Sequence, residues 1–414
     1  MTRILSTVTL LLLLALIMPS AAHGQAFGVM LQNNLMPASG GMGGVSIARP
    51  QDIQSALGGN PATLAQQKGT KFSFSGAWVE PTINMDHDTT IAAASITPFE
   101  SRSRRPGSIV GNIGVTQDLS ALGIPGTVGM GLLTASGLGV NYRDVVASNG
   151  TSAELVALAT GVGAGVDLTD RLSVGLTAVV GSTSMDGIFS GTSGATPDYN
   201  LRALLGFTYD INDSTSIGGY WHTEQKHTFD DFLRVGGAGN PFIDVSLSFP
   251  SVYGLGVANQ SLMNGRLLIG IDVLYFEWSE TDFFGAIWDD QLAVQSGIQF
   301  TTPSGVKFRL GHVYARDASR NVVAPDIGGV INPQSTVDYI QSLFPNINEH
   351  RLTGGIGIKD ILPGVDFDLF AGGQFEDTRD FGDTSVSIES YWIGFGTTWR
   401  FSRGGCCVDA PSRW

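Results

Sequence analysis

Hydrophobic and polar residues alternate along most of this chain. In the stretch VDFDLFAGGQFED, the side chains of Val365, Phe367 and Leu369 share one face of an extended strand, and those of Asp366 and Asp368 share the other. The stretches SYWIGFGTTWRF, RLSVGLTAVV and NLRALLGFTYDI alternate in the same way. Because a period of two is the period of a β-strand, the pattern predicts an all-β protein.

Alternating segments occur fourteen times. They cover residues 71–87, 108–119, 126–144, 153–168, 171–186, 199–211, 215–229, 244–260, 265–280, 291–302, 305–318, 349–362, 365–377 and 387–401. A soluble sandwich also alternates. An even number of long strands, joined in turn by short turns and long loops, instead favours a transmembrane antiparallel β-barrel of about fourteen strands.

The connections between the predicted strands differ in length. Residues 168–170, 212–214, 303–304 and 362–364 are short turns, whereas residues 185–198, 229–245 and 317–349 are long. Short turns are typical of the periplasmic end of a barrel and long loops of the outer end. Within the longest loop, Val337, Ile340, Gln341 and Phe344 recur at helical spacing, which predicts a short amphipathic helix at the mouth or simple loop packing.

The composition agrees with a membrane barrel. Charged residues make up 14% of the chain, whereas soluble domains carry roughly 25%. Glycine accounts for 55 of 414 residues, well above its usual share of roughly 7%. After the N-terminus no apolar run approaches the length of about 18 residues that a transmembrane helix needs.

The pattern of residues 1–24 predicts a secretory signal peptide. Arg3 precedes a short apolar core, and small residues end it, so we expect cleavage near Gly24 or, as second choice, at Ala26. A retained transmembrane helix is the alternative, although the core is short for a span. Export without membrane helices predicts the outer membrane of a Gram-negative bacterium.

Charge and cysteine content exclude other classes. The formal net charge is −14, so we expect no nucleic-acid partner. Only Cys406 and Cys407 are present, which excludes a disulfide-stapled scaffold. They lie in a predicted periplasmic tail, residues 402–414, that is unstructured or that links to a partner or a metal.

No catalytic constellation is recognisable, so we expect neither an enzyme nor a cofactor. The six histidines are scattered, and His222 and His227 cannot reach one metal ion without a bend in the chain. There is no G-x-S-x-G motif, and a triad built on His87 has no serine nearby. We therefore expect no metal site. An outer-membrane hydrolase remains the enzyme alternative.

One glycine-rich stretch, GMGGVSIARPQDIQSALGGNPATLAQQKG, runs from Gly41 to Gly69. A phosphate-binding loop would need a strand before it and a Gly-x-Gly-x-x-Gly or Lys-Ser/Thr register, and both are missing. Together with the following stretch KFSFSGAWVEPTINMD, it resembles the FadL-type outer-membrane transporters of long-chain fatty acids and other hydrophobic compounds. The triplet Asn60-Pro61-Ala62 is the most specific part of this resemblance.

Three further blocks resemble the same family, which extends the resemblance over residues 27–401. They are YNLRALLGFTYDINDSTSIGGYWHTEQKHTFDDF, FPSVYGLGVANQSLMNGRLLIGIDVLYFEWSE and EHRLTGGIGIKDILPGVDFDLFAGGQFED. The resemblance implies that residues 25–69 form a hatch, a plug inside the lumen of a barrel formed by residues 70–401. A flexible surface loop is the alternative for the hatch segment.

The function implied by the resemblance is passive uptake of hydrophobic compounds such as long-chain fatty acids. The solute would bind in an apolar groove between outer loops, with Phe229, Phe232, Leu233 and Phe242 as candidates. The hatch would then move. The solute would leave sideways through a bend in the third strand, where Gly137 and Gly139 form the candidate lateral gate because glycine tolerates a bend.

If the solute is a fatty acid, basic side chains on the lumen face could hold its carboxylate. The candidates are Arg202, Lys307, Arg309, Arg351 and Arg400. Lumen salt bridges with Asp210, Asp366 and Asp368 are the alternative role for these residues.

A second function implied by a related resemblance is a barrel that serves as a shuttle or attachment component of protein secretion. Such a barrel would bind a protein and need no apolar path. Under the first reading the partners are hydrophobic small molecules, fatty acids or hydrocarbons, and outer-membrane lipid, and we expect a monomer.

Overall fold

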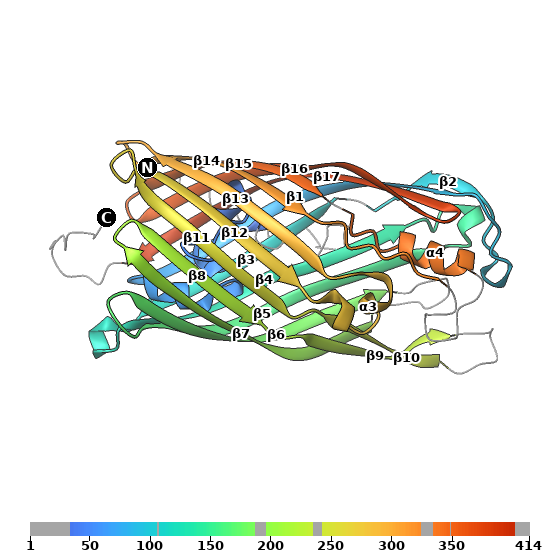
Figure 1. The fold of residues 1–414 in the computed structure, drawn as a ribbon, viewed down its shortest axis with the longest axis horizontal. Coiled ribbons are helices and arrows are strands. Elements are labelled where there is room, and N and C mark those ends of the chain that lie inside the picture. The colour runs from blue at the N-terminus through green and yellow to red at the C-terminus, as the bar shows by residue number, and fades with distance from the viewer. Residues whose placement is uncertain are drawn as a thin grey trace, which may run out of the picture.

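The protein folds as a closed, tilted β-barrel (Figure 1). The computed structural model describes residues 34–105, 107–186, 196–234, 242–323, 334–347 and 349–401. The first strand, β1 (Thr70–His87), pairs along its whole length with the last, β17 (Thr384–Phe401), and this pairing closes an antiparallel ring of fourteen strands. The predicted fold class is therefore confirmed.

Each predicted segment corresponds to a strand of this ring. The remaining strands are β3 (Ser108–Asp118), β4 (Gly126–Asn141), β5 (Ser152–Asp167), β6 (Leu172–Asp186), β7 (Thr196–Asn212), β8 (Thr215–His222), β11 (Val252–Leu262), β12 (Leu267–Phe276), β13 (Gln291–Thr301), β14 (Val306–Ala315), β15 (His350–Leu362) and β16 (Val365–Phe381). A short strand, β2 (Phe99–Arg102), adds to the outer end of β1 and was not predicted.

Two predicted strands are wrong in their outer halves. Segments 215–229 and 244–260 were expected to be continuous, but each breaks in two. Their outer halves, β9 (Gln225–Arg234) and β10 (Phe242–Phe249), form a separate two-stranded hairpin outside the barrel sheet. Pro250 lies at the break and has no backbone N–H to continue the ladder.

Alternation separates the two faces of the wall. On β17 the even-numbered residues from Thr384 to Gly396 are buried, whereas Tyr391 and Ile393 are exposed on the outer face. The exterior carries large exposed apolar side chains on nearly every strand, as a lipid-facing wall requires. Phe370, the apolar residue that broke the alternation on β16, points inward and packs against the plug residue Leu35.

The helical elements are short. They are η2 (Ser39–Met42), α2 (Ile53–Gly58), η3 (Pro61–Gln66), η4 (Ala92–Ala94), η5 (Ser120–Leu122), η6 (Val146–Ser148), η7 (Trp278–Glu280), α3 (Phe284–Ile287) and α4 (Gln334–Ser342). Helix α4 is the predicted helix of the longest loop. In the part of the chain that the structure describes, no helix is long and apolar enough to cross a membrane.

The first three helical elements belong to a plug inside the lumen, drawn in blue in Figure 1. Nearly every residue from Asn34 to Gln67 is buried. Element η2 contacts β13 to β16, and η3 contacts β4 to β7, so the plug reaches both sides of the wall. The predicted signal peptide and the predicted tail with Cys406 and Cys407 lie outside the described residues.

Candidate transport pathway

The Asn60-Pro61-Ala62 triplet is the tightest contact between plug and wall. Asn60 caps η3 by accepting the N–H of Ala62 at 3.1 Å, and Pro61 occupies the first position of η3, where its missing N–H costs nothing. The Asn60 amide donates to the carbonyl oxygen of Ile47 at 2.8 Å and to that of Phe207 in β7 at 2.9 Å. This one side chain therefore joins two parts of the plug to the wall.

Glycines on the inner face of the wall allow this contact. A Cβ added at Gly175 would overlap the backbone of Pro61 and Ala62, and one added at Gly165 would lie 2.7 Å from the Pro61 carbonyl oxygen. Gly206 and Gly218 face the same turn, and a Cβ at either would collide with plug atoms. Plug backbone therefore lies directly against glycines of β5, β6 and β8, and the Asn60 side chain lies against the glycine of β7.

Carboxylates fix the path of the plug. One oxygen of Asp52 accepts the N–H of Ser55 at 2.8 Å and so caps α2, while its other oxygen accepts the N–H of Ser39 at 2.8 Å. Asp272, fully buried on β12, accepts the N–H of Ser46 at 2.7 Å and that of Ile47 at 2.9 Å. Both carboxylates use donors that the irregular plug backbone leaves unpaired.

The wall is not hydrogen-bonded over its full height. Strand β3 pairs with β4 only as far as Ile113 opposite Leu132, although β3 continues its pairing with β1 up to Ser108. Further out, the two sides meet again where the N–H of Arg104 donates to the carbonyl oxygen of Asn141 at 2.8 Å. Between these points, the described backbone of β4 has no ladder to β3.

A bulge accompanies this interval. The pairing of β4 with β5 shifts by one residue between Thr134 and Ser136. Leu133 and Val140 are both buried, so the inward face changes from odd-numbered to even-numbered residues across the bulge. Gly137 and Gly139, the predicted gate, lie beyond it on the unpaired edge, opposite Val156 and Glu154 of β5.

Asn112 spans the lower end of the interval. Its Oδ1 accepts the N–H of Thr134 in the bulge at 2.9 Å, and its amide donates at 3.4 Å to the carbonyl oxygen of plug residue Leu35. Thr134 in turn donates its hydroxyl to the carbonyl oxygen of Gly111 at 3.1 Å. Side chains therefore hold together an edge that the ladder leaves open.

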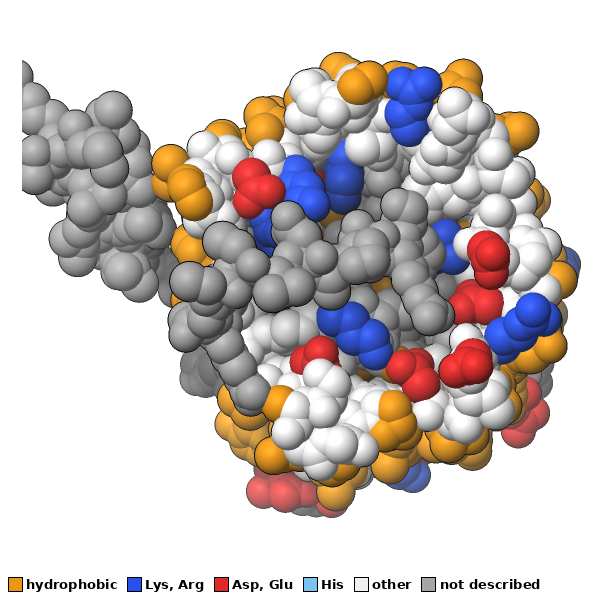
Figure 2. Space-filling model, turned by 90° about the vertical axis from the view of Figure 1, so that its left-hand side faces the viewer, with side chains coloured by type: hydrophobic (Ala, Val, Ile, Leu, Met, Phe, Trp, Pro, Cys, Tyr) orange, Lys and Arg blue, Asp and Glu red, His pale blue; other side chains and the backbone are white. Residues whose placement is uncertain are grey.

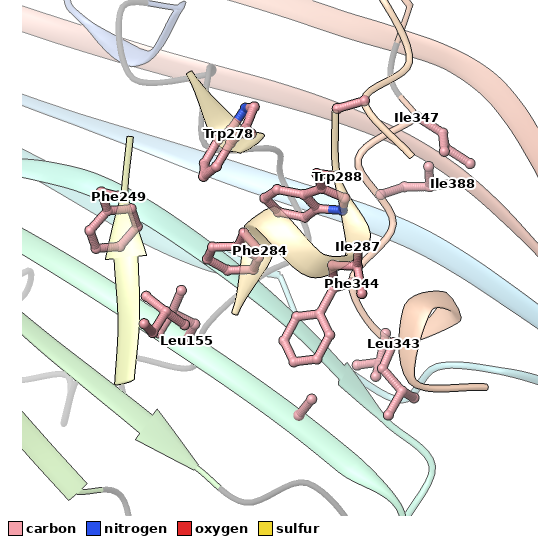
Figure 3. Close-up of a cluster of buried hydrophobic side chains, with 14 of the residues drawn as sticks. Leu155, Phe249, Trp278, Phe284, Ile287, Trp288, Leu343, Phe344, Ile347 and Ile388 are labelled. Carbon is pink, nitrogen blue, oxygen red and sulfur yellow. The ribbon is translucent and has the colours of Figure 1, made fainter. Parts of the chain in front are cut away.

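The outer mouth is closed by an aromatic cluster (Figure 3). Phe284 stacks on Trp288 with ring centroids 4.2 Å apart, and Trp278 meets Trp288 edge-on at 4.7 Å. Phe344 and Ile347, which follow α4, pack into the same cluster. The mouth thus presents a large apolar interior made from loops that are distant in sequence.

The predicted groove residues lie on the β9–β10 hairpin. Phe229 and Phe232 are buried in the apolar cluster of the mouth, at 0% and 3% exposure. Phe242 begins β10 and is partly buried, and the side chain of Leu233 lies outside the described residues. The buried pair lines the inside of the mouth rather than an open surface.

The five predicted lumen cations fall into two tiers. Arg202 and Arg351 lie on the outer side of the plug. The hydroxyl of Thr353 accepts the N–H of plug residue Gly43 at 2.8 Å, and Arg351 is the next inward-facing residue beyond Thr353 toward the mouth. Arg202 donates to the carbonyl oxygen of Pro250 at 3.1 Å. Arg351 is fully buried, and its three guanidinium nitrogens have no hydrogen-bond partner among the described residues. The carboxylate of Asp377 exerts an electrostatic influence on it there.

The other three cations lie at the end of the barrel where β1 begins and β17 ends. Arg309 pairs with Asp368 at 2.5 Å, and Arg400 pairs with Asp366 at 3.1 Å, so the salt-bridge alternative describes these two. Lys307 lines a cavity of about 170 Å³ between plug and wall. Figure 2 looks into this end and shows acidic and basic side chains inside a hydrophobic outer rim.

The scattered histidines serve the structure. His222 donates to the carbonyl oxygen of Gly59 in the plug at 2.8 Å, and His227 bonds to Asp198 at 2.9 Å. The described residues contain no group of three or more histidine, cysteine, aspartate or glutamate side chains that could hold a metal ion.

Sequence reasoning missed Asp272, Asn112 and the inward glycines. The glycines left a signal, because Gly165, Gly175 and Gly206 each occupy an inward position on successive strands. The plug contacts of Asp272 and Asn112 join residues 226 and 77 positions apart and leave no local pattern.

No protein-family model and no curated protein matches this chain. Solved structures match it closely in fold. The Pseudomonas putida toluene transporter TodX aligns with a TM-score of 0.64 and 16% identity, over 92% of this chain and 99% of TodX. A Pseudomonas aeruginosa FadL homologue gives 0.63 and 13%, over 88% and 98%. The Ralstonia pickettii toluene transporter TbuX gives 0.60 and 16%, over 91% and 99%. The expected FadL-type fold is confirmed.

Proposed function

We propose that this FadL-type barrel is an outer-membrane channel for the passive uptake of hydrophobic compounds, long-chain fatty acids among them. The observation that carries the proposal is the combination of a plugged lumen with a wall interval where β3 and β4 are not paired. A plug prevents straight leakage, and an unpaired interval offers a side opening. The related structures carry the names of a toluene transporter and a FadL homologue.

The outer mouth supports the first step. Phe229, Phe232 and the Trp278–Trp288 pair form a buried apolar surface at the outer end of the lumen. A hydrophobic solute would gain free energy on leaving water there, about 0.8 kcal/mol for each buried methylene. We place the solute-binding groove on the inner side of the hairpin, with Phe242 and Leu233 at its edge.

The lateral gate is proposed at the interval between β3 and β4. Gly137 and Gly139 lie on the unpaired edge of β4, where glycine leaves the least side-chain volume. The plug touches both edges, because Leu35 packs with Val110 of β3 and Leu57 packs with Leu133 of β4. Movement of the plug would therefore loosen the interval. An apolar solute leaving there would enter lipid.

For a solute with a carboxylate, Arg351 is the best candidate among the five lumen cations. A buried guanidinium with no hydrogen-bond partner among the described residues is costly, and a carboxylate could satisfy it with two charge-assisted hydrogen bonds. Arg202, on the same outer side of the plug, could add a second contact. Arg309 and Arg400 are already paired with aspartates, and Lys307 lies beyond the plug.

Uptake by purified protein in liposomes tests the proposal. Vesicles loaded with a trapping agent are offered toluene, an alkane, oleate or a sugar, without any energy source. We expect hydrophobic compounds to enter at a rate proportional to the amount of protein, and the sugar to stay outside. No protein-dependent flux, together with co-purification of secretion subunits from cells, would favour the secretion alternative.

A further inference from the structure

A gap in strand pairing separates the β9–β10 hairpin from strands β8 and β11 of the barrel. The pairing within the hairpin, Gln225 opposite Phe249, continues in the same register as His222 opposite Val252 in β8 and β11. The interruption is therefore local and covers two residues on each side, Thr223 and Glu224 facing Pro250 and Ser251. A slip in register, which would move every side chain to the other face, has not occurred.

Neighbouring strands take over the backbone groups at the interruption. The N–H of Thr223 donates to the carbonyl oxygen of Ala203 in β7 at 2.9 Å, and the N–H of Glu277 donates to the carbonyl oxygen of Ser251 at 3.1 Å. Pro250 contributes no N–H. The two strands of the hairpin are thus joined to the barrel by a short stretch without cross-strand bonds, which is the structure of a hinge.

Beyond this hinge, side-chain contacts rather than a strand ladder hold the hairpin to the wall. Gln225 donates to the carbonyl oxygen of Asn200 at 2.7 Å, and Asp198 accepts the N–H of Thr228 at 3.2 Å. In the described residues β9 and β7 share no ladder. Instead, Nδ1 of His227 lies 2.9 Å from Asp198 on β7, and its Nε2 lies 3.0 Å from the hydroxyl of Thr183 on β6. Lys226 forms an ion pair of 2.6 Å with Asp282 in the loop before α3.

The protonation of His227 fits this arrangement. Burial lowers the pKa of His227, with Asp198 opposing the shift, so the ring is neutral near pH 7. A neutral imidazole donates from one nitrogen and accepts at the other. Nδ1–H therefore donates to Asp198 while the Thr183 hydroxyl donates to Nε2, and both polar groups of the wall are satisfied.

The inner face of the hairpin is apolar. Phe229, Phe232, Leu247 and Phe249 are all buried in the cluster that fills the mouth. Figure 3 shows Phe249 of the hairpin in the same cluster as Leu155 of β5 and Phe284 of α3. In this position of the hairpin, these four side chains separate the apolar interior of the mouth from the solvent.

From these observations we infer that the β9–β10 hairpin is a flap, hinged at Thr223–Glu224 and Pro250–Ser251. His227 and Asp198 are the positioning residues that latch it to the wall, and the flap must swing outward to admit a solute. This inference rests on the proposed function as a hydrophobic channel. It identifies the moving part at the outer mouth, separate from the plug and from the interval in the wall.

A reversible tether tests whether the flap must move. The variant Lys226→Cys/Asp282→Cys, made in a Cys406→Ser/Cys407→Ser background, places two thiols where the ion pair joins flap and loop. The control Thr228→Cys/Ser246→Cys joins the two strands within the hairpin, where the hydroxyls lie 3.3 Å apart. A bis-methanethiosulfonate linker of matching length, which dithiothreitol also cleaves, replaces the direct disulfide if oxidation is incomplete.

We expect the oxidised flap-to-loop pair to lose hydrophobic uptake in liposomes and to regain it with dithiothreitol, while the control pair transports like the parent in both states. Undiminished uptake at complete cross-linking would overturn the flap. If the untethered parent itself takes up no hydrophobic compound, the proposed function fails instead, and the labelling experiment below still decides on the flap.

A labelling experiment tests the latch. Phe249→Cys is exposed to a membrane-impermeant maleimide, alone and combined with Asp198→Asn. We expect labelling to be roughly tenfold faster with the weakened latch, because local opening exposes the buried position. Ser246→Ala, which removes a bond within the hairpin only, is expected to leave the rate unchanged. Equal rates in Asp198→Asn and Ser246→Ala would overturn the assignment of His227 and Asp198.

Discussion

The plug and the outer mouth both fill the lumen, but they are attached to the wall in different ways. At Pro61 and Ala62 the plug backbone lies against glycines of β5 and β6, with no side chains between them. At the mouth, Phe229 and Trp288 fill space with large side chains carried by loops and a hairpin. Backbone contact leaves no room for repacking, whereas side chains can rotate and separate.

Under the proposed channel function, this difference gives the two regions separate roles. The glycine-lined contact would keep the plug in one position at rest and so prevent leakage. In the aromatic cluster, a hydrophobic solute could replace the contacts that the apolar side chains now make with one another. Between the two lies Arg351, a buried cation whose guanidinium has no hydrogen-bond partner among the described residues, at the boundary where the solute would first reach the plug.

The largest effect is expected from removing the plug. Deleting residues 27–68 should leave an assembled barrel, because the strand ladders, closed by β1 and β17, satisfy the backbone without it. Permeability to small polar dyes should rise at least about tenfold, since a barrel of this size encloses an aqueous lumen. Dye efflux from liposomes measures this, with heat-modifiable gel migration as the control for assembly. Unchanged efflux would mean that these residues do not seal the lumen.

A single side chain in the glycine-lined contact should imitate the deletion in part. Gly175→Val places atoms where the backbone of Pro61 and Ala62 lies, and backbone cannot turn aside. We expect the plug to be displaced and dye efflux to rise severalfold. The matched control is Gly354→Val, where an added Cβ meets nothing closer than 3.6 Å. If both variants leak equally little, the glycine contact does not hold the plug.

Replacing Arg351 tests the boundary between the two regions. Arg351→Met removes the charge and keeps much of the volume. Binding of a fatty acid should weaken about tenfold to a hundredfold, the scale of a lost charge-assisted hydrogen bond. Binding of the alcohol with the same chain should stay the same or improve. Isothermal titration of both ligands measures this pair, and an equal loss for acid and alcohol would contradict a carboxylate role.

The last variant tests the wall at the predicted gate. Gly137→Val/Gly139→Val adds two side chains to the unpaired edge of β4 and favours a regular strand. Hydrophobic uptake should fall roughly tenfold, equivalent to about 1.4 kcal/mol added to the barrier, at normal abundance and dye-tightness. Parental uptake at equal abundance would reject lateral exit at this site and leave the channel itself in place.

Much of the fold follows from the sequence because a lipid-facing wall repeats one simple rule. Every second residue faces lipid, so alternation located all fourteen barrel strands. The helix near Val337 was found separately, from the helical spacing of its apolar residues. The outer halves of segments 215–229 and 244–260 were misassigned because alternation persists through the hairpin. Pro250 marks the break, but a single proline does not reveal whether a strand ends or only bends.

The candidate pathway was harder to predict, for a different physical reason. Alternation placed Arg309, Arg351 and Arg400 on the lumen face, but it carries no information on height or partner. Arg351 lies at a different height along the barrel axis from Arg309 and Arg400. Aspartates on strand β16 neutralise Arg309 and Arg400, and alternation does not reveal these partners. The interval between β3 and β4 is likewise a property of two strands together and leaves no trace in either one alone.

The most direct test of the central claim is to follow the solute through the protein. A long-chain fatty acid or alkane carrying a diazirine is photolysed during uptake into proteoliposomes, and labelled residues are mapped by mass spectrometry. The account predicts labels above the background of the lipid-facing exterior in two places, the aromatic cluster with Phe229 and Phe284, and the interval formed by residues 108–112 and 133–140. Labels confined to the exterior, or concentrated in the cavity beside Lys307 and Asp368 at the opposite end, would contradict it.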